Sequence, residues 1–258
     1  MIISFLEKFK RTFKIALALA KTNFSLRIEG SYLGIIWYLL NPLALFLIII
    51  LIKNNITNDF SIKNYEIYLL LGIISFNFFK QTLANSITSI SNNINYLKSI
   101  NNISPETLVI SDLITSLMSH FFDLVLIVIF MLLYNIPLIG LLLYPLILFF
   151  FIIMLLGFSF IFATLGVYVK DYNNVWSIIT QLLFFLSPIF YTITEKDYLY
   201  YFNLLNPLFY FLTIIRSLLI DFSLPSASIV ITFITTSLLS FIFGLFIFNK
   251  YKKKFAEQ

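Results

Sequence analysis

Residues 32–52 read YLGIIWYLLNPLALFLIIILI, a run that contains no charged side chain. As a helix this run would be about 30 Å long, which matches the hydrocarbon core of a bilayer. Further apolar runs follow at residues 67–83, within 107–134, up to residue 168, at 175–192 and at 228–248. The chain is 60% hydrophobic and only 11% charged, whereas about 25% of the residues in a soluble domain are charged. The sequence therefore predicts an all-α polytopic membrane protein with six transmembrane helices.

Positive charge is distributed unequally between the two sides that these six spans define. Of the 17 Lys and Arg residues, 13 fall on one side, and only Lys53, Lys63, Lys196 and Arg216 fall on the other. Basic residues near the ends of spans stay in the cytoplasm, so this asymmetry predicts that both termini are cytoplasmic. The net charge of +5 then faces anionic lipid headgroups, and we expect membrane lipids rather than nucleic acid as its partner.

The N-terminal segment, residues 5–28, predicts an amphipathic helix that lies in the membrane interface. Its apolar side chains fall within one 120° arc of a helix, and its basic side chains Lys10, Arg11, Lys14 and Lys21 fall on the other side. Such a helix rests with its apolar face in the acyl boundary and its basic face toward phosphates. A helix that packs on a partner is the alternative.

Residues 198–220 are long enough to span, but Asn203, Asn206 and Pro207 interrupt the run. A seventh span here would place the basic C-terminal residues outside, against the charge asymmetry. We therefore expect an outer re-entrant pair of half-helices, whose broken backbone must be covered by protein.

Motifs for nucleotide or metal chemistry are missing from the sequence. No Gly-Lys-Ser or Gly-Lys-Thr occurs, so the chain has no Walker A loop. It has one histidine and no cysteine, which excludes disulfides and thiolate metal sites. We expect no catalytic residue, cofactor site or metal site on this chain, and if ATP drives it, another chain hydrolyses the ATP.

His120 and Asp123 lie three residues apart within the third span and therefore share one helix face. Ionisable groups inside a membrane are costly and often functional, so a proton relay is one interpretation. The one we favour is that Asp123 pairs with His120 or with neighbouring hydroxyl groups as a packing contact. A membrane-embedded enzyme or a proton-driven carrier would need more such groups at mid-membrane.

Four stretches, in this order, resemble those of one known family. The first is Tyr32-Leu33-Gly34-Ile35-Ile36-Trp37-Tyr38-Leu39-Leu40-Asn41-Pro42-Leu43, which follows the basic amphipathic segment. The others are SISNNINYLK at 89–98, LSPIFY at 186–191, and LNPL at 205–208 followed by Arg216. The set resembles the permease subunits of type 2 ABC exporters that move polysaccharides, including O-antigen, capsule and teichoic acid. The chain departs from the family in its cytoplasmic loop, where Pro105 comes late and follows Ser104 instead of an aromatic residue.

The resemblance implies a single transporter transmembrane domain over residues 1–258 that forms a homodimer. It also implies two copies of a separate ATPase subunit, which would hold ATP and Mg²⁺. The substrate would be a lipid-linked polysaccharide that crosses the cytoplasmic (inner) membrane of a bacterium. Export of small molecules such as drugs by the same architecture is the alternative.

The resemblance further assigns roles to individual residues. Residues 85–106 would form the cytoplasmic loop that couples to the ATPase, through Asn92, Asn93, Asn95 and Lys98. Sugar rings stack on aromatic faces, so Trp37 and Tyr38 would line the glycan channel at the cytoplasmic mouth, and Phe185, Tyr191 and Tyr210 at the outer mouth. For any one of these aromatic residues, a place in the interfacial belt is the alternative. The motif positions with structural roles would be Gly34, Pro42, Pro188, Asn206, Pro207 and Arg216.

Overall fold

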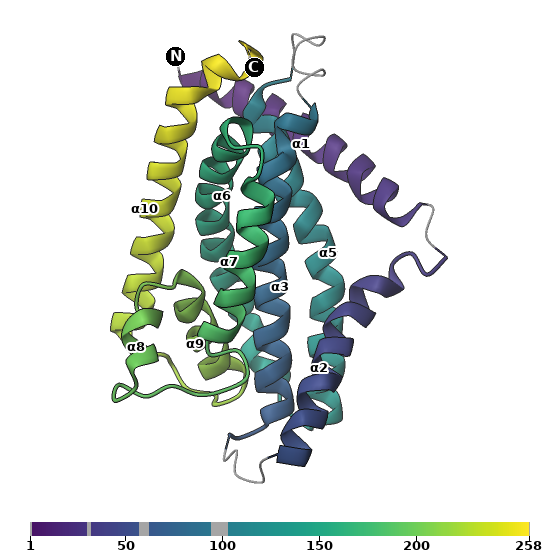
Figure 1. Cartoon of the computed structure of the whole chain (residues 1–258), viewed down its shortest axis with the longest axis vertical. Helices are drawn as coiled ribbons and strands as arrows, with labels where there is room; N and C mark the ends of the chain where they lie inside the picture. Colours follow the sequence, from purple (N-terminus) through teal and green to yellow (C-terminus); the bar gives the residue numbers. More distant parts are fainter. Residues whose placement is uncertain (1, 30–31, 57–61, 94–102, 258) are drawn as a thin grey trace.

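The computed structural model describes residues 2–29, 32–56, 62–93 and 103–257, and over these ranges the protein is helical with no β-strand (Figure 1). The helices are α1 (Ile2–Ile28), α2 (Ile36–Ile56), α3 (Tyr65–Ser89), α5 (Pro105–Leu133), α6 (Tyr144–Tyr168), α7 (Tyr172–Leu186), α8 (Tyr198–Asn203), α9 (Pro207–Leu219) and α10 (Ala227–Tyr251). Short 3₁₀ segments occur at η1 (Ser91–Asn93), η2 (Leu138–Leu142) and η3 (Lys252–Glu257). In the described ranges, α2, α3, α5, α6 and α10 are long and apolar enough to cross a membrane.

The central helix is α3, which packs against α2, α5, α6, α7 and α9. Most of its side chains are buried, including the fully buried Leu69, Leu70 and Ile73. Both termini lie at one end of the molecule, and the short helices α8 and α9 lie toward the other end (Figure 1).

Helix α1 crosses the end of the molecule that carries the termini and packs along α5 (Figure 1). Its contact is made through small side chains, since Ala16 and Ala20 are fully buried, and the carbonyl of Ala20 accepts a 3.5 Å hydrogen bond from the Thr115 hydroxyl. The four basic side chains expected on the polar face, Lys10, Arg11, Lys14 and Lys21, are exposed. The helix therefore combines a packed small-residue stripe with an exposed basic side.

The fifth expected span, residues 175–192, is shorter in the structure than the sequence predicts. Helix α7 has 15 residues and ends at Leu186. At 1.5 Å per residue it is about 22 Å long, less than the roughly 30 Å of a hydrocarbon core. The cause is Pro188, because a proline disfavours helical geometry in the residue before it, and Ser187 is extended with φ −82° and ψ 146°. Within the residues that the structure describes, five long helices, rather than six, therefore meet the length of a span.

The C-terminal segment docks on the end of the molecule where α5 begins. Phe255 of η3 is buried in a small apolar cluster with Ile90, Val109 and Phe248. Next to this cluster, the ammonium group of Lys252 forms an ion pair with the carboxylate of Glu106. These contacts join the C-terminal end of α10 to the end of α3, at Ile90, and to the start of α5, at Glu106 and Val109.

Candidate functional site

A cavity of about 630 Å³ opens between α1, α2, α3 and α5. Polar residues form much of its wall, although the helices that supply them are mostly apolar. On α5 these residues are Ser116, Ser119, His120 and Asp123. Their spacing of three, four and seven residues places them on one face of the helix. A second cavity, of about 290 Å³, is lined mainly by apolar and aromatic side chains.

A second polar stripe faces the cavity from α3, at Asn77, Gln81 and Asn85. Positions four residues apart share a helix face, so these amides form one row. The Gln81 amide donates to the side-chain oxygen of Asn85 over 2.8 Å, and Asn85 in turn donates to the Ser116 hydroxyl over 3.0 Å. These bonds join the two stripes at one end of the cavity and fix the separation of α3 and α5 there.

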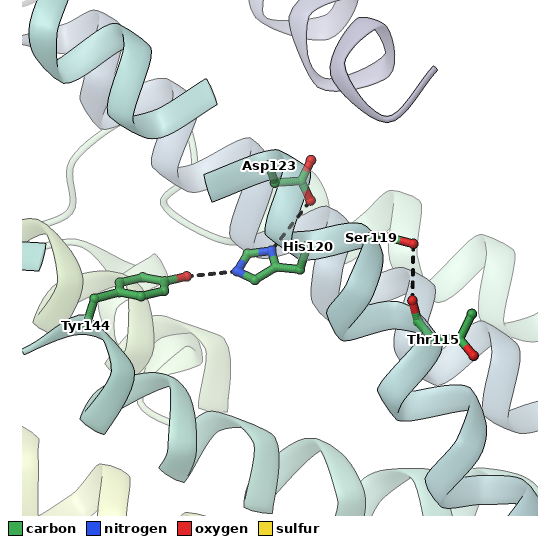
Figure 2. Close-up of polar contacts among 5 residues, drawn as sticks. All are labelled: Thr115, Ser119, His120, Asp123 and Tyr144. Carbon is green, nitrogen blue, oxygen red and sulfur yellow. Dashed lines mark hydrogen bonds and ion pairs between the residues drawn. The ribbon is translucent and has the colours of Figure 1, made fainter. Parts of the chain in front are cut away.

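His120 has neighbours on three sides, and Figure 2 shows two of them, Tyr144 and Asp123. Its Nε2 lies 2.8 Å from the hydroxyl of Tyr144 on α6, and its ring stacks on Phe78 of α3 with centroids 4.3 Å apart. Its Nδ1 faces Asp123 Oδ2 at 3.5 Å. The His120 side chain is 2% exposed, whereas that of Asp123 is 15% exposed. The prediction that His120 and Asp123 share a face is confirmed. Both line the cavity, and the carboxylate is the more exposed of the two.

Aromatic residues close the cavity on the α2 side. Tyr38 stacks with Phe24 of α1 at 5.9 Å and with Phe122 of α5 at 6.1 Å, so three rings join three helices. Trp37 also lines the cavity and is 48% exposed. Pro42 lies inside α2 and removes the backbone donor that would otherwise bond to the carbonyl of Tyr38.

Gly34, in the turn before α2, has φ 48°, a left-handed conformation that favours glycine. We expect Gly34→Ala to lower stability by about 1–3 kcal/mol, because a residue with a Cβ is strained there. Gly34→Asn should retain more stability, since asparagine tolerates this conformation better than alanine. Thermal unfolding midpoints of the two purified variants check this, and equal midpoints would contradict it.

A second polar cluster, at the end of α7, involves four motif positions from the sequence. The Arg216 guanidinium, 6% exposed, donates to the carbonyls of Pro188 (2.6 Å), Ile189 (2.9 Å) and Tyr68 (3.1 Å). It also lies 3.4 Å above the centroid of the Tyr68 ring. One cation thereby satisfies the carbonyls that the break in α7 leaves without helical donors.

The neighbouring polar groups complete this cluster. The Asn206 amide donates to the Ser187 hydroxyl over 2.8 Å, and its oxygen caps α9 at the backbone N–H of Leu208 over 3.1 Å. Pro207 follows at the first position of α9, where a missing N–H costs nothing. Asn203 donates to the carbonyl of Leu186 over 2.9 Å. This cluster holds α8 and α9 against the end of α7.

The five aromatic residues expected along a glycan channel are not brought together in this chain. Trp37 and Tyr38 border the cavity, and Phe185 is exposed on α7. The hydroxyl of Tyr191 donates to the carbonyl of Leu186 over 2.8 Å. Tyr210 is 7% exposed, and its hydroxyl donates to the carbonyl of Leu204 over 2.7 Å, so its ring has little face left for a sugar.

The segment expected to couple to an ATPase is shorter than residues 85–106, because α3 continues to Ser89 and α5 begins at Pro105. Asn92 is exposed in η1, and Asn93 donates to the carbonyl of Ser89 over 2.8 Å. Asn95 and Lys98 lie outside the described residues.

Two groups of residues that the structure uses were not predicted from the sequence. The amides of α3 are spaced four residues apart within an apolar run, and this spacing is a signal for a polar stripe on one face. Tyr65 and Tyr68 donate to the carbonyls of Phe190 (3.0 Å) and Tyr191 (2.7 Å), and no pattern in the sequence marks them. Among the described residues, no group of three His, Asp or Glu side chains is placed to hold a metal ion.

The chain is similar along nearly its whole length to known transport proteins. Two proteins of Klebsiella pneumoniae, each called O-antigen export system permease protein RfbA, are 28% identical to it over 254 and 251 residues. A protein of the same name from Myxococcus xanthus is 22% identical over 248 residues. Each alignment covers 95% of both chains. The family described as ABC-2 type transporter matches residues 16–220, which is more than half of the chain, and the protein therefore belongs to the ABC-2 type transporter family.

Proposed function

We propose that this chain is the permease subunit of an ATP-driven exporter of a lipid-linked polysaccharide of the O-antigen, capsule or teichoic acid type. The names of three relatives that match over 95% of both chains support this substrate class. The observation that carries the proposal is the polar cavity between apolar helices. A hydroxyl-rich polymer needs hydrogen-bonding groups along its path through a membrane, and the amides, hydroxyls and carboxylate that line the cavity supply them.

ATP hydrolysis in this proposal belongs to a separate subunit that holds ATP and Mg²⁺. Support comes from the sequence, in which no Gly-Lys-Ser or Gly-Lys-Thr occurs. Two such subunits would contact a homodimer of this chain near the connection between α3 and α5, which includes Asn92, Asn93, Asn95 and Lys98. The docked C-terminal segment at this connection, with the ion pair between Lys252 and Glu106, would pass their motion to α10.

The proposed setting is the cytoplasmic (inner) membrane of a bacterium, with both termini in the cytoplasm. The 13 Lys and Arg residues on the side of the termini support this orientation. Both termini lie at one end of the molecule (Figure 1), which supports an even number of crossings. We assign the sixth crossing to α7 together with the extended residues that follow it. The outer re-entrant pair would then be α8 and α9, with Arg216 satisfying the broken backbone.

Depletion of this chain in its native cell tests the proposed function. The long surface glycan and the lipid-linked glycan are measured separately in the cytoplasmic membrane fraction and at the cell surface. We expect lipid-linked polymer to accumulate inside while the surface becomes bare, and a second copy of the wild-type chain should reverse both changes. Unchanged surface glycan, combined with lost efflux of small hydrophobic compounds, would contradict polysaccharide export and favour small-molecule transport.

A further inference from the structure

The carboxylate of Asp123 has hydrogen-bonding capacity that the protein does not use. An ionised carboxylate accepts about four hydrogen bonds. The ionic partner of Asp123 among the described residues is His120, at 3.5 Å, which is longer than an ordinary N–H···O bond. Figure 2 shows one carboxylate oxygen turned toward the His120 ring and the other turned away from it. Asp123 borders the cavity, so this free capacity is available to a ligand there.

The surroundings of His120 argue against a role in packing alone. Tyr144 and Phe78 already hold the imidazole ring, through the 2.8 Å contact and the 4.3 Å stack. A carboxylate that served only as a packing contact would approach Nδ1 to hydrogen-bond distance, because a half-satisfied polar group inside the protein costs free energy. Instead Nδ1 makes no hydrogen bond among the described residues. The arrangement is a rigidly backed carboxylate that faces an open space.

The rest of the cavity wall supplies the other groups that a sugar ring requires. Amides such as Asn41 and Asn77 both donate and accept, as hydroxyl groups do. The half-exposed indole of Trp37 offers an apolar face for the C–H side of a ring. The volume of about 630 Å³ lies within the range of small-molecule sites. Along α5 the wall extends from Ser116 to Asp123, about 10 Å at 1.5 Å per residue.

We propose that this cavity is a carbohydrate-binding subsite in which the Asp123 carboxylate accepts hydrogen bonds from the hydroxyl or amide groups of one sugar unit. The cavity wall also carries two cations, Arg27 and Lys80. A uronic acid whose carboxylate lies next to Asp123 would bring a second negative charge to that position, and a neutral or N-acetylated hexose avoids this repulsion. His120 and Tyr144 are positioning residues that fix the carboxylate. The inference rests on the proposed function, since the sugar unit belongs to the transported polymer, and it adds which residues select that unit.

Binding to the purified full-length chain in lipid nanodiscs tests this subsite. The chain has two tryptophans, so Trp176→Phe leaves Trp37, in the cavity wall, as the only tryptophan, whose emission is followed with excitation at the red edge where tyrosine does not absorb. Three probes are titrated: a short prenyl diphosphate that carries one N-acetylhexosamine, the same carrier with one hexuronic acid, and the carrier without a sugar. We expect the N-acetylhexosamine probe to bind more tightly than the other two.

Asp123→Asn should weaken binding of the N-acetylhexosamine probe at least tenfold and should not weaken binding of the bare carrier. It should also bring the affinity of the hexuronic acid probe closer to that of the N-acetylhexosamine probe. Tyr68→Phe is the matched control, because it also removes the hydroxyl of a buried tyrosine, in the cluster at the end of α7 and not in the cavity wall. It should lower the unfolding temperature but leave each dissociation constant within about twofold of the wild-type value. A purely structural cluster predicts the same small binding change for both variants.

Asn41→Ala, at an exposed position of the cavity wall, covers the case in which Asp123→Asn does not fold. It should weaken binding of the N-acetylhexosamine probe severalfold without a change in unfolding temperature.

The inference is wrong if the wild-type chain does not bind this probe more tightly than the other two, or if both cavity variants bind it as tightly as the wild type does. If depletion removes the surface glycan but the binding result is negative, the proposed subsite is wrong and the proposed function is still supported. Normal surface glycan after depletion would overturn the function instead.

Discussion

Replacing Arg216 by alanine is expected to destabilise the protein by more than about 3 kcal/mol and to abolish its transport activity. Among the described residues, the change removes the only donor to the buried Ile189 carbonyl and the closer donor of the Pro188 carbonyl, which keeps the Tyr68 hydroxyl at 3.3 Å. Each buried acceptor that loses its partner costs about 1–3 kcal/mol. The contact between the guanidinium and the Tyr68 ring is lost as well. We therefore expect a much lower unfolding temperature for the purified variant and little intact protein in the membrane.

Two variants make the Arg216 experiment specific. Arg216→Lys should restore only part of the lost stability, because an ammonium group does not reproduce the planar fork that reaches several carbonyls at once. Lys196→Ala removes a cation from an exposed position in the segment between α7 and α8 and should unfold at the wild-type temperature. If Arg216→Ala unfolded within a degree or two of the wild type, the cluster would not be what holds α9 against α7.

Gly157→Leu is expected to separate α6 from α10 and to prevent accumulation of folded protein. A Cβ atom on Gly157 would overlap the backbone of Ser240, and one on Gly244 would overlap the backbone of Gly157. Small residues allow two helices this close approach inside a membrane, where helix association depends on tight packing. Ordinary overpacking costs about 1–3 kcal/mol, and a clash with backbone atoms should cost more because the whole helix has to move.

The matched control for Gly157→Leu is Thr235→Leu, which adds bulk to an exposed position of α10. It should give wild-type amounts of folded protein on size-exclusion chromatography in detergent, whereas Gly157→Leu should elute as aggregate. A monodisperse, thermally stable Gly157→Leu protein would show that the close contact between the two helices is not required.

Local signals in the sequence predicted several features of α7 and α9. The break before α9 follows from Asn206 as a capping residue and Pro207 at the first helical position, and the structure has both. Pro188 ends α7 by the same kind of local rule. The length of α7 was overestimated, because hydropathy continues across Pro188 while the helix does not.

Features that depend on contacts between distant residues could not be predicted. That His120 and Asp123 share a face follows from their spacing, but the bond from His120 to Tyr144 depends on how α5 and α6 pack. The cavity depends on the separation of four helices, which no single helix encodes. Arg216 was expected to have a structural role, yet its partners Tyr68 and Ile189 lie far from it in the sequence.

Reconstitution of this chain with its ATPase in proteoliposomes tests the central claim most directly. Lipid-linked polymer is incorporated with its glycan inside vesicles whose ATPase subunits also face the lumen and are loaded with ATP and Mg²⁺. A lectin outside then reports any glycan that crosses. Polysaccharide export predicts that lectin binding rises with time when ATP is present and stays at background when ATP is replaced by a non-hydrolysable analogue. ATP hydrolysis without any increase in lectin binding would contradict export of this polymer by the chain.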